Sequence, residues 1–422
     1  MVFFFALFLG IKKRIEVFLV AAFICLYPAF LDNYSFGIDH ITFALADTFA
    51  LIGIIYYKRK SGDQIRAISL SICFFVLALA SYQPKISLIA FLCICYLLTS
   101  FTNLHNKHLF SWKHLLLKFS SILSVFFGSC LIYFLSIKLT IVTNIGQRTH
   151  INTLTELTNE LLSAYSSFVS YYTIDSDYLP LQLRFMPIAI IFIGCLALIY
   201  RASRNHISLT PVVSVLLLLV PISLRLSYII NNQTWEYAGR ITFVNCYALI
   251  FFISSVLHIE NLNKFIRFII GLFLYYFIVI GTQESNAAAI KTVYDLNMIN
   301  RISSRIESVT PNLYKKKYAL VVIGHYPSFD RSRYVKGNSK NAPHVASFAF
   351  ESYRQTEILN YFFGRDILVR PTNDQMRRTI ASAKDRQSYP ASDSVYLIDD
   401  EIIVVLLENH TENSPKTWID VQ

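Results

Sequence analysis

Long apolar runs separated by short polar links dominate the first two thirds of the chain. A helix needs about 17 to 25 mostly apolar residues to cross a lipid bilayer. The pattern therefore predicts nine transmembrane helices, several at the short end of that range, at residues 15–31, 41–57, 67–82, 86–101, 119–142, 185–200, 211–230, 241–258 and 268–282. The expected fold class is a polytopic all-α membrane protein.

The first ten residues are also apolar, but the run is too short to cross a bilayer by itself. It is followed by the basic group Lys12, Lys13 and Arg14. A secretory signal peptide has the opposite order, with the basic residues before the apolar ones. We interpret residues 1–10 as the end of a span that begins before this chain.

From residue 283 onward, charged and apolar residues alternate as in a soluble domain. The pattern predicts a helix over 287–309 and a buried strand over 318–323 that ends at Gly324. Two β-rich runs, 395–398 and 402–407, flank a short acidic turn and predict a hairpin. We therefore expect a transmembrane domain over 1–282, with an outer loop at 143–184, and a small α/β domain over 283–422.

Composition and charge support a membrane protein rather than a nucleic-acid-binding one. Apolar residues make up 54% of the chain and charged residues only 15%, against roughly 25% charged in soluble proteins. The net charge is +11, but alternate links between spans carry 14 Lys and Arg, against 4 on the opposite side. By the positive-inside rule, links 32–40, 83–85, 143–184 and 231–240 face outward, as does everything after residue 282.

Two further features bear on the fold rather than the chemistry. All seven cysteines lie in or beside apolar runs, so we expect no disulfide framework and assign no metal to them. Within the outer loop, apolar residues at 151, 154, 157, 161 and 162 form one stripe of a helix. Such a helix either lies in the membrane interface or packs against the bundle, and both interpretations remain open.

Several short motifs, in this order, resemble the Gtr type II glucosyltransferase family. They are Leu26-Tyr27-Pro28 with Asn33-Tyr34-Ser35-Phe36 and Asp39, then Tyr82-Gln83-Pro84-Lys85, and finally Ser388-Tyr389-Pro390 through Ile402-Ile403-Val404-Val405. The resemblance implies a GT-C-like multispan fold in the bacterial inner membrane, with a periplasmic C-terminus. It also implies glucosylation of the lipopolysaccharide O-antigen, the reaction that converts bacterial serotype.

The resemblance has consequences for substrates and partners. Nucleotide sugars stay in the cytoplasm, so a transfer on the outer face implies undecaprenyl-phosphate glucose as donor and an O-antigen glycan as acceptor. A flippase and a glucosyltransferase that makes the donor would be partners, and no cofactor is expected. The chain starts after the further spans and acidic outer loop expected of the family, so a truncated start, a second polypeptide or an inactive remnant are alternatives.

Such a transfer needs a carboxylate that deprotonates the acceptor hydroxyl and a cation near the departing phosphate. Asp39 is the preferred base and Asp32 the second; both border an outer link, where turn residues are the alternative. The pair Asp175 and Asp177 resembles a metal-binding motif, but a solvated loop is the better interpretation.

The candidate donor-binding residues lie in three outward segments: Lys85 and Gln83, Arg225, and Trp235, Glu236 and Arg240. Arg225 interrupts an apolar run, and an intramembrane charge is costly unless it is paired or hydrated. Snorkelling to the surface, or a buried pair with Glu236, is its alternative role. Trp235 and its neighbours could instead form an aromatic belt at the interface.

Other functions compatible with the composition are a lipid-linked glycan flippase or transporter and an O-antigen polymerase or ligase. A flippase should show an internal repeat or paired broken helices, and the sequence shows neither. A polymerase typically carries several arginines in its long outer loop, whereas residues 143–184 contain only Arg148 and Arg184.

Overall fold

A computed structural model describes residues 1–11, 13–27, 39–59, 64–102, 111–140, 154–173, 179–230, 244–257, 259–324, 355–383 and 386–407. They form two compact units, one built from Met1–Thr282 and the other from residues after it. Each unit is described by itself.

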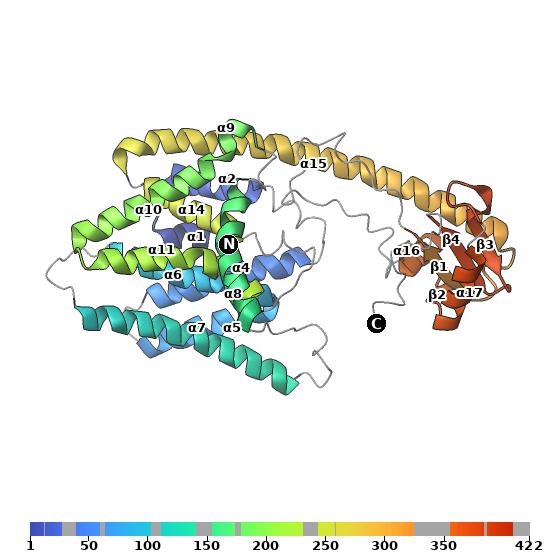
Figure 1. Cartoon of the computed structure of the whole chain (residues 1–422), viewed down its shortest axis with the longest axis horizontal. Helices are drawn as coiled ribbons and strands as arrows, with labels where there is room; N and C mark the ends of the chain where they lie inside the picture. The colour runs from blue at the N-terminus through green and yellow to red at the C-terminus, as the bar shows by residue number, and fades with distance from the viewer. Residues whose placement is uncertain are drawn as a thin grey trace. The chain divides into compact units, whose positions relative to one another are not determined.

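The first unit is helical (Figure 1). Its elements are α1 (Val2–Leu9), α2 (Arg14–Leu26), α4 (Asp39–Lys58), α5 (Gln64–Ser81), the 3₁₀ turn η1 (Gln83–Lys85), α6 (Ile86–Thr102), α7 (Trp112–Thr140), α8 (Leu154–Tyr172), α9 (Leu181–Arg184), α10 (Met186–Asn205), α11 (Leu209–Leu224), α12 (Leu226–Ile230), α14 (Val244–Leu257) and the first part of α15 (Glu260–Val309).

Each of the nine apolar runs contains helix, but not all of these helices reach full spanning length. Among the described residues, six helices are long and apolar enough to cross a membrane: Ile41–Lys58, Gln64–Ser81, Gln83–Thr102, Leu115–Leu139, Met186–Asn205 and Leu262–Val309. The apolar helices α11 and α14 are shorter, with 16 and 14 residues, and α2 has 13. The polytopic helical fold is confirmed, and the described residues contain six helices of full spanning length.

The predicted run 211–230 is not one helix. It divides into α11 and α12 at Arg225, whose backbone φ and ψ of −103° and 9° leave the helical region. Pro221 lies in the last turn of α11, and proline removes one helical hydrogen bond and crowds the preceding turn. The break places a charged side chain at a helix end instead of inside a continuous span.

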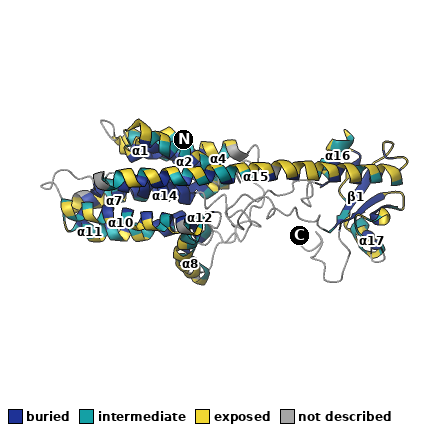
Figure 2. Ribbon diagram, turned by 90° about the horizontal axis from the view of Figure 1, so that it is seen from above, coloured by how far each residue is buried: buried dark blue, intermediate teal, exposed yellow. Residues whose placement is uncertain are grey.

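The core of this unit is formed by helices without exposed faces. Every residue of α14 is buried, and so are most residues of α6, which Figure 2 shows for α14 in dark blue. The helices α4 and α5 approach closely at Gly53, where an added Cβ would lie 2.7 Å from ring carbons of Phe75. Small residues permit such close approach of helices in membranes.

The amphipathic helix predicted from residue 151 is confirmed as α8 (Leu154–Tyr172) and continues ten residues past the predicted stripe. It runs across the axes of the neighbouring helices (Figure 1). The hydroxyl of Tyr165 donates a hydrogen bond to the carbonyl of Leu218 in α11, at 3.0 Å, and α8 also packs against α12. Of the two interpretations left open by the sequence, these contacts support packing against the bundle.

The second unit is a small mixed α/β domain, as predicted. Its strands are β1 (Tyr318–Ile323), β2 (Leu368–Val369), β3 (Val395–Ile398) and β4 (Ile402–Leu406), in the order β2-β1-β4-β3. Strand β1 is parallel to both β2 and β4, and β3 pairs with β4 as the predicted antiparallel hairpin. Its other elements are α16 (Gln355–Phe363), α17 (Asn373–Ala383) and the 3₁₀ turn η6 (Ser392–Ser394).

Helices cover both faces of this sheet. On one face, Leu320 and Ile403 pack with Ile302 of α15 and Leu359 of α16. On the other face, residues such as Val321 and Val404 pack with Ala383 and Met376 of α17. This alternation follows from the period of two along a strand.

Candidate active site

Arg225 lies at the break between α11 and α12, and its side chain is held by groups from two helices. Its Nε donates a hydrogen bond to Oε2 of Glu160 at 3.0 Å, and Nη1 donates to Oγ of Ser167. The guanidinium carbon lies 5.1 Å from the centre of the Tyr228 ring, a cation–π distance. The charge that interrupts the apolar run is thus paired with Glu160; the alternative partner Glu236 lies outside the described residues.

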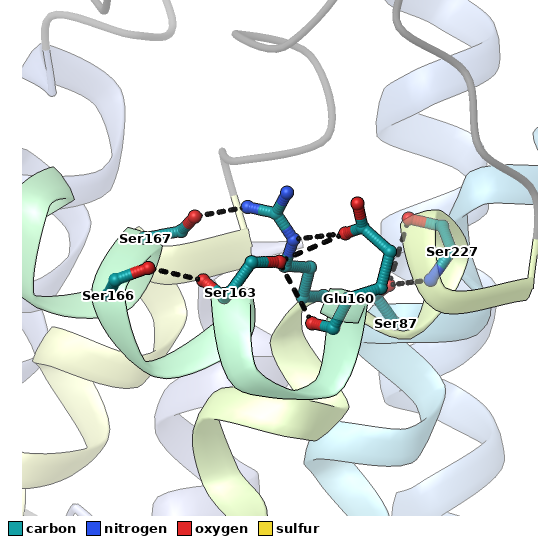
Figure 3. Close-up of polar contacts among 7 residues, drawn as sticks. Ser87, Glu160, Ser163, Ser166, Ser167 and Ser227 are labelled. Carbon is teal, nitrogen blue, oxygen red and sulfur yellow. Dashed lines mark hydrogen bonds and ion pairs between the residues drawn. The ribbon is translucent and has the colours of Figure 1, made fainter. Parts of the chain in front are cut away.

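The carboxylate partner comes from the polar side of α8. Glu160 also accepts a hydrogen bond from the hydroxyl of Ser163 at 3.1 Å, and Ser163 in turn accepts one from Ser166 through its carbonyl. Figure 3 shows the three α8 serines and Glu160 along one side of the helix. The Arg225 and Glu160 side chains are 25% and 20% exposed, so the pair is accessible and surrounded by hydroxyl groups.

A second polar contact joins α12 to α6. The backbone N–H of Ser227 donates to Oγ of Ser87 at 2.9 Å, and the hydroxyl of Ser87 lies 3.1 Å from that of Ser227. Helix α12 starts only one residue before Ser227, so its N–H lacks an intrahelical partner. The contact fixes the start of α12 to the first turn of α6, two residues after Lys85.

Lys85 ends η1 and is part of a buried cluster. Its Nζ lies 2.7 Å from Oδ1 of Asp47, and the two side chains are only 10% and 2% exposed. The hydroxyl of Tyr247 donates to the other oxygen, Oδ2, at 3.0 Å. The rings of Phe43 and Tyr82 lie 5.9 and 6.0 Å from Nζ, within cation–π range.

Two carboxylates in these clusters, Glu160 and Asp47, were not among the predicted site residues. Asp47 lies in the middle of the predicted span 41–57, and an acidic residue at such a position indicates function or a buried pair. That signal was present in the sequence. Glu160 gave a weaker signal, because an acidic residue on the polar side of an amphipathic helix is ordinary.

Of the remaining predicted site residues, the structure describes only Gln83 and the backbone of Asp39. Gln83 is exposed in η1, the expected tight turn between two spans. Asp39 is the first residue of α4, about two turns before Asp47. The side chain of Asp39 lies outside the described residues, as do all of Asp32, Asp175, Asp177, Trp235, Glu236 and Arg240.

The Arg225–Glu160 and Lys85–Asp47 pairs of the first unit thus differ in accessibility. The planar guanidinium of Arg225 matches the geometry of a phosphate, and the serine hydroxyls beside it can bind sugar hydroxyls. Among the described residues, no group of three or more His, Cys, Asp or Glu could hold a metal ion. The chemistry available is recognition of an anion and of hydroxyl groups.

The family model for glucosyl transferase GtrII matches residues 1–235. The chain belongs to this family. The membership confirms the resemblance and makes the protein a glycosyltransferase, which decides against the transporter interpretation. Arg225, Glu160, Lys85 and Asp47 all lie inside the matched range, whereas the second unit lies beyond it. No curated protein and no solved structure matches the chain.

Proposed function

We propose that this GtrII-family protein transfers glucose from undecaprenyl-phosphate glucose to the lipopolysaccharide O-antigen on the periplasmic face of the bacterial inner membrane. The observation that carries the proposal is Arg225, an accessible guanidinium at a helix break in a bundle of apolar helices. A lipid-linked donor presents its phosphate at the membrane surface. An arginine there binds that phosphate by charge-assisted hydrogen bonds.

The reaction is a substitution at the anomeric carbon of glucose. The acceptor hydroxyl forms the new C–O bond while the bond to the lipid phosphate breaks, and the phosphate leaves with the electron pair. Cations stabilise the negative charge that develops on it, and we assign this role to Arg225 and Arg240. Lys85, the third predicted cation, is held by Asp47 in a buried pair. A carboxylate accepts the acceptor's proton; Asp39, at the start of α4, stays our proposed base, with Asp32 as the second candidate.

The glucose ring needs contacts of its own. We assign these to Gln83, which is exposed beside Lys85 in η1, and to Trp235 and Glu236. Aromatic rings offer a flat apolar surface to a sugar, while amides and carboxylates bind its hydroxyls. The distribution of Lys and Arg between alternate links supports an outward position for these segments.

Substitution of Arg225 tests the proposal. The protein, reconstituted in liposomes with undecaprenyl-phosphate glucose and O-antigen, should transfer glucose, and Arg225→Gln should lower the rate by about 100-fold or more, the typical effect of losing one donor to a developing anion. Arg204→Gln, at an exposed position at the end of α10, is the matched control and should keep the full rate.

Two results would count against this account. Normal transfer by the Arg225→Gln variant would remove Arg225 from the site. Absence of transfer by the unsubstituted protein, with both substrates present, would refute the proposed function itself.

A further inference from the structure

The pair formed by Arg225 and Glu160 raises a question that the proposed function does not answer. If Arg225 receives the donor phosphate, the position beside its Nε is already occupied by Oε2 of Glu160, at 3.0 Å. A carboxylate and a phosphate at the same guanidinium edge repel each other. Either Glu160 prevents donor binding or it moves away when the donor arrives.

We propose that Glu160 occupies the donor-phosphate subsite at Arg225 when the donor is absent, and that the phosphate of the lipid-linked sugar displaces it. The inference rests on the proposed function. It adds that a carboxylate of the protein itself competes with the donor phosphate for Arg225. In this arrangement Glu160 compensates the charge of Arg225 while the site is empty. It also lowers the affinity for the donor.

Comparison of the Arg225–Glu160 pair with the Lys85–Asp47 pair shows which of these two can exchange its partner. The Lys85 and Asp47 side chains are 10% and 2% exposed, so separating them would leave a charge buried without a partner, which is strongly unfavourable. The Arg225 and Glu160 side chains are 25% and 20% exposed. The more exposed pair costs less to separate than the buried one, because more solvent reaches its charges. A phosphate can therefore replace Glu160 at a lower cost than it could replace Asp47.

Arg225 also has supports that do not depend on Glu160. Its Nη1 donates to Ser167, and its guanidinium stacks over Tyr228. Both contacts can remain when Glu160 leaves, so the cation stays oriented toward the incoming phosphate.

The exchange needs only a side-chain rotation. Helix α8 is held on α11 by the hydrogen bond from Tyr165 to the carbonyl of Leu218, which does not involve Glu160. The Ser163 hydroxyl, one turn along α8, already donates to Glu160 at 3.1 Å and can keep this hydrogen bond with the displaced carboxylate. The helix can thus remain in place while its glutamate changes partner.

Binding of undecaprenyl phosphate, the lipid phosphate without the sugar, tests the inference on the full chain in lipid nanodiscs. Glu160→Gln removes the competing charge with little change in shape and should tighten binding by roughly two- to fivefold, the factor expected for an accessible ion pair. Glu160→Ala should act in the same direction. Arg225→Gln should weaken binding by about tenfold or more.

The opposite signs of these changes separate the proposal from a structural role. If Glu160 only attaches α8 to the bundle, Glu160→Gln should behave like Tyr165→Phe, which removes another hydrogen bond between α8 and the bundle. Neither variant should then tighten binding. Weakened or unchanged binding in both Glu160 variants would overturn the inference. Glucose transfer by the unsubstituted protein in the same nanodiscs tests the proposed function separately, because the binding changes do not require turnover.

Discussion

The substitution Asp47→Asn tests how much the negative charge of Asp47, the buried partner of Lys85, contributes to stability. The substitution keeps the shape of the side chain, and the amide oxygen can still accept the hydrogen bond from Tyr247. It removes the counter-charge 2.7 Å from Nζ of Lys85. At an effective dielectric constant near 20, two unit charges at that distance attract by about 6 kcal/mol.

The net effect on stability is smaller than this attraction but still large. Removing one partner of a buried ion pair typically costs about 3–5 kcal/mol, because the other charge stays buried alone, whereas replacing both partners by apolar groups is often neutral. We expect Asp47→Asn and Lys85→Met each to lower the free energy of unfolding by that amount. The double variant should be more stable than either single variant.

Thermal unfolding of the purified protein in nanodiscs compares the unsubstituted protein, the two single variants and the double variant under one condition. A transition temperature unchanged by Asp47→Asn would refute the reasoning, because the buried pair would then make no net contribution. The double variant serves a second purpose. If it is stable but transfers no glucose, the buried pair is needed for catalysis as well as for stability; full activity would remove Lys85 from the site.

Three further substitutions test contacts and backbone conformation within each unit, by the same unfolding measurement. Gly53→Ala should destabilise the protein by about 1–3 kcal/mol, because the new Cβ would lie 2.7 Å from the Phe75 ring. Gly271→Ala is the control, since no atom lies within 4 Å of its new Cβ. Equal effects of the two substitutions would contradict this reasoning. Arg305→Lys should cost about 1–3 kcal/mol, since its guanidinium holds three acceptors in residues 390–394; no loss would show these contacts to be dispensable. Asp400→Val should cost about 1–2 kcal/mol, because φ is +55° there and a β-branched residue resists that conformation; an unchanged transition would contradict this.

Much of the fold was readable from local pattern. Strand β1 (Tyr318–Ile323) and the hairpin around residues 399–401 appear where the sequence predicted them. A buried strand bounded by Gly324 and a β-rich pair joined by a short turn are signals carried by neighbouring residues. Both turn residues Asp399 and Asp400 have positive φ, as the tightest hairpins require.

The lengths of the helices and the pairing of charged residues were harder to predict from the sequence. The break at Arg225 follows Pro221, which the sequence shows, but the docking of α12 on α6 through Ser87 and Ser227 is not contained in a hydropathy pattern. The partners Arg225 and Glu160 are 65 residues apart. One sequence alone does not specify which carboxylate meets which cation across a bundle, although the cost of an unpaired intramembrane charge does specify that each needs a partner.

Glucose transfer from the lipid-linked donor is the most direct test of the central claim. The purified full chain would be reconstituted in liposomes with O-antigen and either undecaprenyl-phosphate glucose or the nucleotide sugar UDP-glucose, each carrying an isotopic label in glucose. We predict labelled O-antigen, with release of an equal amount of undecaprenyl phosphate, from the lipid donor alone. Transfer from UDP-glucose, or no transfer from the lipid donor, would contradict the account.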